Sequence, residues 1–256
     1  MSLNIKQFNV LNTTSGKMPI TGRLTSSVLS TILSYNTIRT GTTENVIVPG
    51  TPVAITSGAL FNNAHMSTSF IKIVRSTFVN SSIDTVYVPD GFIRISYLKG
   101  ICDFENTILY GFTPFPNETL NNITFNVAFA SSLSQTEGDY IDVALPNMPG
   151  DLYLVIILLV NVWSTRTIVS GNRCSIDSTN AKYNYCIKPS LSGNDMINSH
   201  FIVIQGKNTN QGIFSHIVLG IEDDIFAFSD KDYNDFQIGI GSRSILSAQV
   251  NDNSLS

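Results

Sequence analysis

The amino-acid sequence predicts an all-β fold: a β-sandwich or jelly-roll-like pair of antiparallel sheets, with an extended N-terminal arm and one short helix. From residue 51 onward, apolar residues recur with a period of two, as they do in half-buried strands. Turn signals such as Pro89-Asp90-Gly91 separate many short apolar segments, which is typical of sandwiches and jelly rolls. With 256 residues, the chain is long enough for one large β domain or two small ones.

Residues 1–50 are rich in Ser, Thr and Asn and form the predicted arm. Within the arm, apolar residues at helical spacing predict a short helix over residues 23–35. The apolar residues of this face are Leu24, Val28, Leu29, Ile32 and Leu33. The arm carries too little apolar surface to form a core alone. We therefore expect a chain lacking residues 1–40 to keep its sandwich and to lose assembly.

The β-rich part divides into a segment at 51–130 and a second segment at 131–245, followed by a tail at 246–256. Whether the two segments form one continuous domain stays open. Strands are predicted at residues 52–56, 70–79, 83–88, 92–98, 107–112, 123–130, 140–145, 152–160, 183–187, 201–205, 213–221 and 236–240. The strand at 152–160 shows no polar alternation, so we expect it to be central and buried on both faces. Residues 172–198 suggest a long loop region.

Composition excludes several classes of protein. Charged residues make up 13% of the chain, against about 25% in an average globular domain, which suits an extracellular protein or a packed assembly. A pI near 5.3 without a basic cluster argues against nucleic acid as a partner. The longest apolar run has nine residues, whereas a membrane helix needs about 20, so no membrane span is expected. The first ten residues lack the pattern of a secretory signal, so we expect any export to use another route or an assembling particle.

No motif predicts an enzyme, since H-E-x-x-H, G-x-S-x-G and a Walker-type loop are absent from the sequence.

Three aromatic side chains are candidates for a sugar-stacking platform, although burial in the core is the stronger expectation for the tryptophan. Two histidines are placed to approach each other on adjacent strands, but ordinary packed or surface histidines are the stronger expectation. Of the cysteines, two are spaced to pair across a hairpin or to stay free and buried, and the odd count argues against a disulfide framework. The aromatic candidates are Trp163, Tyr183 and Tyr185, and the two histidines are His200 and His216. The two cysteines spaced to pair are Cys174 and Cys186, and Cys102 is the third cysteine of the chain.

Acidic residues concentrate in one stretch between two apolar strands. Residues 222–235 contain six acids and one lysine, a local net charge of −5. The rest of the chain carries 13 acids and 14 basic residues, so the whole acidic excess lies in this loop. Such crowding is costly unless a cation neutralises it. A solvated acidic loop is the alternative interpretation.

The spacing of the oxygen-bearing side chains favours Ca²⁺. Asp230, Asp232 and Asn234 alternate, so an extended segment directs all three to one side. Asp235 has the opposite parity, so the chain must turn near Asn234. Ca²⁺ takes six to eight hard oxygen ligands. We predict one Ca²⁺ held by Glu222 or Asp223 together with Asp230, Asp232 and Asp235, with Asn234 or backbone carbonyls completing the shell. Asp224 is the acid left outside.

The stretch is not an EF-hand, because Asp235 replaces the turn glycine and Gly241 stands where the closing glutamate belongs. Instead, E-D followed by D-K-D-Y-N-D and an apolar strand resembles a family of calcium-binding β-sandwich domains. That family is labelled a domain of unknown function and occurs in secreted bacterial adhesins. The resemblance covers about residues 120–240 and implies a Ca²⁺-stabilised sandwich, sometimes glycan-binding. Its motif residues here are Glu222, Asp223, Asp230, Asp232, Tyr233, Asn234 and Asp235.

Two functions are expected from the sequence. The first is a non-enzymatic, calcium-stabilised structural protein of a virion or particle surface, similar to a minor capsid protein, with other protein subunits as partners in a homo- or hetero-oligomer. Its support is the polar arm, the low charge and the lack of a catalytic motif. The alternative is an extracellular, adhesin-like module that binds a glycan, which the family resemblance favours. Both place the protein on a virion or extracellular surface.

Overall fold

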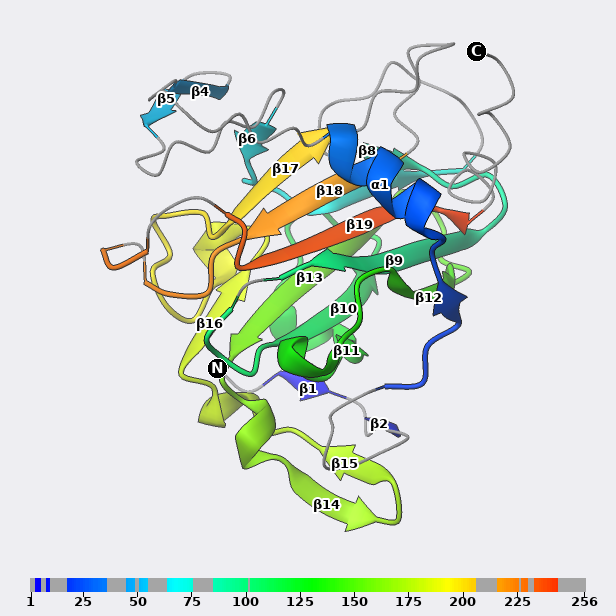
Figure 1. Cartoon of the computed structure of the whole chain (residues 1–256), viewed down its shortest axis with the longest axis vertical. Coiled ribbons are helices and arrows are strands. Elements are labelled where there is room, and N and C mark those ends of the chain that lie inside the picture. The colour runs from blue at the N-terminus through cyan, green and yellow to red at the C-terminus, as the bar shows by residue number, and fades with distance from the viewer. Residues whose placement is uncertain are drawn as a thin grey trace.

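Two large β-sheets build the protein, as the computed structural model shows (Figure 1). The structure describes residues 3–5, 8–9, 18–35, 45–48, 51–54, 64–75, 85–100, 102–205, 216–225, 227–229 and 233–243. Most strand pairs in the two sheets are antiparallel, and the described parallel pairs are β1–β11 and β7–β8. The predicted all-β, sandwich-like fold is thereby confirmed.

The first sheet has the strand order β1-β11-β10-β13-β7-β8, and β16 also pairs with β13. Its strands are β1 (Asn4–Ile5), β7 (Ile71–Val74), β8 (Thr85–Tyr87), β10 (Thr107–Thr113), β11 (Thr124–Phe129), β13 (Leu152–Val160) and β16 (Tyr183–Cys186). The second sheet has the order β3-β12-β9-β19-β18-β17-β6. Its strands are β3 (Gly22–Arg23), β6 (Ala64–Met66), β9 (Phe92–Lys99), β12 (Asp139–Ala144), β17 (Phe201–Gln205), β18 (His216–Ile221) and β19 (Phe236–Ser242).

One large apolar cluster joins side chains of both sheets. It contains β13 and β10 from the first sheet, and β9, β18 and β19 from the second. Strand β13 is the most deeply placed, because every residue from Leu154 to Val160 is fully buried. The expectation that this run is a central strand buried on both faces is confirmed. Strands from 51–130 and from 131–245 lie side by side in each sheet, for example β10 beside β13 and β9 beside β19.

The helix α1 (Ser26–Tyr35) packs against the second sheet (Figure 1). It begins after Thr25, whose hydroxyl accepts a hydrogen bond from the backbone N–H of Val28 at 3.4 Å, as an N-cap residue does. The helix predicted at 23–35 is therefore confirmed with a start three residues later. A second apolar cluster forms beneath it from Leu24, Val28, Ile32, Leu98, Ile202, Val218 and Tyr233.

The arm therefore contributes to the apolar interior, which its composition did not predict. Leu24, Val28 and Ile32 are each at least nine-tenths buried, and β3 adds a strand to the second sheet beside β12. At its other end, β1 extends the first sheet and the backbone N–H of Leu3 donates to the Ser178 hydroxyl at 3.0 Å. The described parts of the arm thus contact both sheets.

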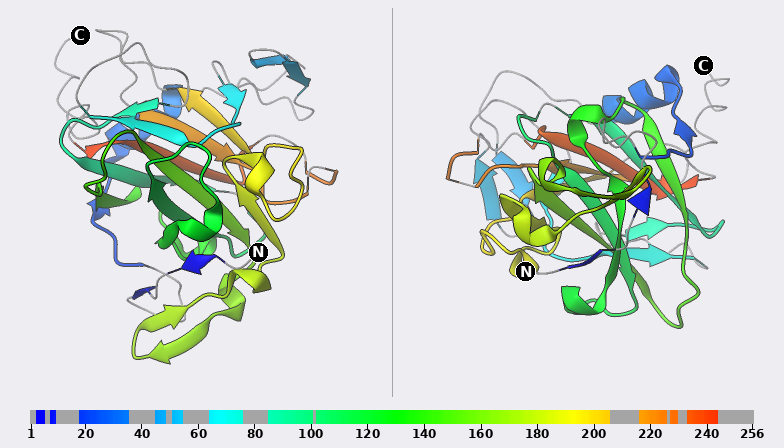
Figure 2. Two further views of the ribbon diagram at one scale, coloured as in Figure 1. Left: turned by 180° about the vertical axis from the view of Figure 1, so that it is seen from behind. Right: turned by 90° about the horizontal axis from the view of Figure 1, so that it is seen from below.

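Smaller elements surround the sandwich. A three-stranded sheet of β14 (Thr167–Ser170), β15 (Arg173–Ser175) and β2 (Phe8–Asn9) projects at the bottom of Figure 1 and in the left view of Figure 2. Strands β4 (Asn45–Val48) and β5 (Thr51–Ala54) form a separate hairpin. The expected long loop at 172–198 instead holds β15, β16 and two short 3-10 helices, η4 (Ser178–Asn180) and η5 (Pro189–Leu191). The remaining 3-10 helices are η1 (Leu120–Asn122), η2 (Ser132–Ser134) and η3 (Trp163–Thr165). No helix in the described ranges is long and apolar enough to cross a membrane.

Candidate metal centre in the acidic loop

The acidic loop joins two neighbouring strands of the second sheet. It leaves β18 after Ile221 and returns to β19 at Phe236, and both strands are buried along their whole length. In Figures 1 and 2 the loop lies at the same end of the sandwich as the segment before β17. A hydrogen bond of 3.0 Å from the Glu222 backbone N–H to the His200 carbonyl ties the two together. The acidic residues of the loop therefore lie directly next to the ends of two buried strands.

Glu222 organises the loop internally. Its side chain is 1% exposed, and its carboxylate accepts hydrogen bonds from the Ser229 hydroxyl and from the backbone N–H of Tyr233. Tyr233 has a φ of 54°, a left-handed conformation that non-glycine residues seldom adopt. The turn expected near Asn234 therefore falls one residue earlier.

Tyr233 also anchors the loop through its buried ring. The ring lies in the cluster beneath α1, and its hydroxyl lies 3.2 Å from the Ser199 carbonyl, to which it donates. Gly220 permits this approach, because a Cβ there would lie 2.7 Å from the Tyr233 carbonyl oxygen. The loop's return path is consequently fixed by a glycine, a buried ring and a buried carboxylate.

Asp223 and Asp235 meet at the two ends of the loop. The Asp235 carboxylate accepts a hydrogen bond of 2.9 Å from the backbone N–H of Asp223. Asp223 is 4% exposed, and its carboxylate accepts a 2.6 Å hydrogen bond from the Asn106 side chain. Burial raises the pKa of Asp223, hydrogen bonds to Asn106 and Asp235 oppose that rise, and the charges of Asp224 and Asp103 add to it. This corner thus concentrates negative charge in a place that is poorly solvated.

The remaining predicted ligands differ in how the structure places them. Asn234 forms an isolated parallel bridge with Ile221. Asp224 is one-third exposed and lies 4.0 Å from the Lys182 ammonium, and its expected position outside the shell stays a prediction. Asp230 and Asp232 lie outside the described residues. Among the residues that are described, no group of three or more acids, histidines or cysteines stands close enough to hold a metal ion.

Of the described acids that the sequence predicted as ligands, Asp223 and Asp235 suit a cation better than Glu222 does. Both oxygens of Glu222 already accept hydrogen bonds from the chain, so Glu222 positions the loop and Asp223 is the better ligand of that pair. The carboxylates of Asp223 and Asp235 are hard oxygen donors, of the kind Ca²⁺ prefers. Both are of the donor type that this ion takes, and Asp230, Asp232 and Asn234 are the predicted sources of its other ligands.

Two contributors to this corner carry no signal in the sequence. Asn106 lies 117 positions from Asp223, and its side-chain oxygen accepts a hydrogen bond of 3.4 Å from the Asn161 backbone N–H. Cys102 lies within electrostatic range of both acids, and burial is the main cause that raises its pKa to about 11. Its thiol is therefore protonated at neutral pH and is a poor metal ligand.

The other candidate groups are placed differently from the expectations. His200 lies at the start of β17 beside Glu222, whereas His216 pairs with Gly241 at the far end of β18, so the two histidines do not approach each other. Trp163 and Tyr185 are buried and only Tyr183 is partly exposed, so the three rings form no exposed platform. All three cysteines are free, and the Cys174–Cys186 disulfide is not formed.

No family model, no curated protein and no solved structure matches this chain. The resemblance to the calcium-binding sandwich family, over about residues 120–240, therefore stays a prediction from the sequence.

Proposed function

We propose that the protein is a non-enzymatic structural subunit of a virion or particle surface, and that Ca²⁺ bound in its acidic loop stabilises the sandwich. One observation carries the proposal: the Asp235 carboxylate accepts a hydrogen bond from the backbone N–H of Asp223, which brings the two acids together where β18 ends and β19 begins. A cation shared by these two residues joins the ends of the loop and cancels their repulsion. Ca²⁺ supplies this charge and binds the oxygen ligands, whereas the chain positions them through Glu222 and Tyr233.

Assembly with other subunits is supported by surface composition. Exposed apolar side chains occur on the projecting strand β14, on the loop before β17 and in the acidic loop, and exposed apolar surface can mark contact sites. A glycan-binding module receives less support, because Trp163 and Tyr185 are buried and a sugar needs exposed rings for stacking.

The calcium proposal is tested by thermal unfolding of the whole protein in millimolar Ca²⁺ and in chelator. A ligand at 100 times its dissociation constant stabilises the fold by about 2.7 kcal/mol, so we expect a clearly higher melting temperature in Ca²⁺. Asp223→Asn and Asp232→Ala should remove most of this response. Asp224→Asn is the matched control and should keep it. Equal melting curves in Ca²⁺ and chelator, with no metal in the purified protein, would leave a solvated acidic loop.

The structural role is tested separately by purification from the source. Co-sedimentation with particles, or a concentration-dependent oligomer, supports a subunit of an assembly. Specific binding of the isolated protein to a glycan array, without oligomers or particles, would favour the adhesive module instead.

A further inference from the structure

Exposed apolar side chains gather at two separate places. Of the seven large apolar side chains that are exposed within the described residues, two lie on β14 and three lie on loops at the end that carries the acidic loop. Those on β14 are Ile168 (51% exposed) and Val169 (44%), and those on the loops are Met196 (59%), Ile197 (94%) and Phe228 (76%). Exposed apolar side chains of this size are stabilised when an interface buries them.

The first place is the projecting hairpin, defined here as residues 166–175. All four residues of β14 are exposed, and β14 is one of the two edge strands of its three-stranded sheet in the part of the chain that the structure describes. The hairpin contains two arginines and no acid. Its base is firm, because the Arg166 guanidinium lies over the Trp163 ring at 4.2 Å and donates to the Trp163 carbonyl at 3.0 Å. An apolar edge flanked by positive charge is thus held away from the body of the protein.

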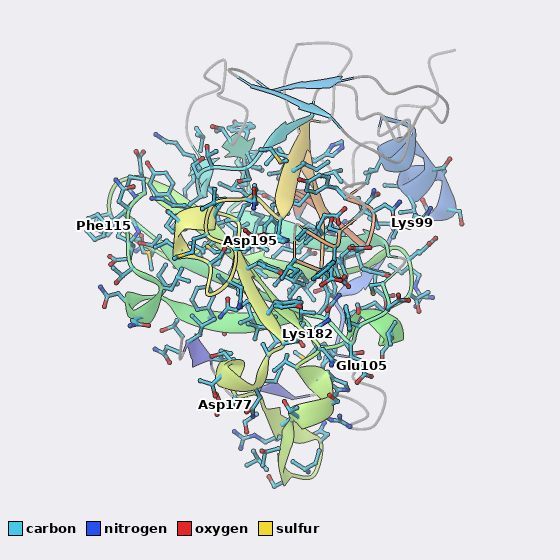
Figure 3. The ribbon with its side chains drawn as sticks, turned by 90° about the vertical axis from the view of Figure 1, so that its left-hand side faces the viewer. Lys99, Glu105, Phe115, Asp177, Lys182 and Asp195 are labelled. Carbon is cyan, nitrogen blue, oxygen red and sulfur yellow. The ribbon has the colours of Figure 1, made fainter. Side chains whose placement is uncertain are left out.

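The second place is the acidic end, defined here as residues 192–199, 222–225, 227–229 and 233–235. These ranges contain five acids and no lysine or arginine. Two of these acids, Asp195 and Asp224, have side chains 20% and 33% exposed, and the exposed apolar Ile197 and Phe228 belong to the same ranges. In Figure 3, Asp195 lies near the middle of the face, whereas Asp177 lies lower, toward the projecting hairpin. The two places therefore occupy different parts of one molecule.

We propose that the projecting hairpin of one copy docks on the acidic end of a second copy of this chain. The inference rests on the proposed structural function and names its partner and its contact. Apolar side chains are available on both surfaces, and the charges are opposite, so contact buries Ile168 and Val169 against Ile197 and Phe228 while arginine meets carboxylate. A bound Ca²⁺ lowers the charge of residues 222–235 from −5 to −3, so the attraction persists when the ion is present.

Charge selects this pairing over contacts between like surfaces. Two projecting hairpins both carry positive charge and two acidic ends both carry negative charge, so contacts between like surfaces are repulsive. Because the two surfaces differ, each copy offers one of each, and the contact propagates head to tail into a ring or a filament.

The contact is tested by sedimentation velocity of the whole protein over a range of concentrations and salt. Arg173→Glu and Asp224→Arg should each weaken self-association by about tenfold or more, which corresponds to 1.4 kcal/mol. The double variant Arg173→Glu/Asp224→Arg restores the charge pair and should recover association. High salt should weaken association of the unmodified protein, because exposed charges are screened.

Apolar variants supply the matched control. Ile168→Ser should weaken association, whereas Phe115→Ser should not, because Phe115 is 59% exposed but belongs to neither surface and lies apart from Asp195 and Asp177 in Figure 3. Circular dichroism checks that each variant stays folded. Self-association that none of these variants changes would overturn the docking contact and leave the structural function standing. A monomer at every concentration would also overturn it, while co-sedimentation with particles still decides the structural function.

Discussion

Glu222 and Asp223 are neighbouring acids with different roles. Both oxygens of the Glu222 carboxylate accept hydrogen bonds that shape the loop. The Asp223 carboxylate accepts a hydrogen bond from Asn106, and the Asp223 backbone N–H donates to Asp235. From the charge pattern of the sequence alone, both acids are candidate ligands of a cation. The distinction depends on which backbone N–H groups return to the loop, and this is fixed by the left-handed turn at Tyr233.

Replacing Glu222 should therefore reduce stability more than metal binding. Glu222→Ala leaves the Tyr233 N–H and the Ser229 hydroxyl without their acceptor, and an unsatisfied buried group costs about 1–3 kcal/mol. Urea unfolding should show this loss in both Ca²⁺ and chelator, with the difference between the two conditions retained. If the variant keeps its stability and loses its calcium response, Glu222 is a ligand.

A buried histidine predicts acid sensitivity. Burial lowers the pKa of His216 from 6.5 to about 4, so between these values the unfolded chain binds a proton that the folded chain does not. The free energy of unfolding should then fall as pH drops from about 6.5 to 4, by up to about 3 kcal/mol. His216→Leu should flatten this part of the stability curve, measured by urea unfolding at several pH values. An unchanged slope in the variant would assign the acid sensitivity to other groups.

At the scale of elements, β9 and β12 are joined by a charged pair as well as by their backbones. Arg94 and Asp142 lie opposite each other and form two hydrogen bonds of 2.7 and 2.9 Å. Both side chains are at least nine-tenths buried, and the guanidinium also lies 3.7 Å from the Tyr140 ring centre. A pair held this firmly fixes the register of the two strands.

Breaking this pair should be costly. Asp142→Ala leaves a buried, unpaired guanidinium, and removing one partner of a buried pair costs about 3–5 kcal/mol. Asp151→Ala is the comparison, because its pair with Lys72 is exposed and exposed pairs contribute about 0–1 kcal/mol. Similar losses for both variants in chemical unfolding would show that burial does not decide the strength of the pair.

The sequence patterns predicted those helices and strands whose formation depends mainly on their own residues. The unbroken apolar run of β13 and the helical spacing of α1 are local signals, and both elements lie close to their predicted bounds. Strands β14 and β15 were missed because they are short and polar at their ends, and β14 is exposed along its whole length. Asn106 was missed because its role depends on a contact with Asp223 that only folding creates. The separation of His200 from His216 depends on strand register, which the pattern does not specify.

At the scale of the whole molecule, the arm is part of the fold. Leu24, Val28 and Ile32 cover Leu98 and Val218 of the second sheet. We therefore replace the expectation that loss of residues 1–40 leaves the sandwich intact. Ile32→Ala should lower the free energy of unfolding by about 2–5 kcal/mol, and deletion of residues 1–40 should lower it further. A truncated protein with an unchanged melting temperature would show that the arm is dispensable.

The position of β19 has a consequence for how the chain reaches its native state. Strand β19 lies between β9 and β18 in the middle of the second sheet, although it is the last described strand in the sequence. During synthesis, β9 has to wait for this neighbour until the residues up to Ser242 have left the ribosome. Strands β10, β11 and β13 lie close together in sequence and need no such delay. Since contacts between distant segments slow folding and prolong the exposure of apolar strands, the half-built second sheet is the stage at which newly made chains are most prone to aggregate.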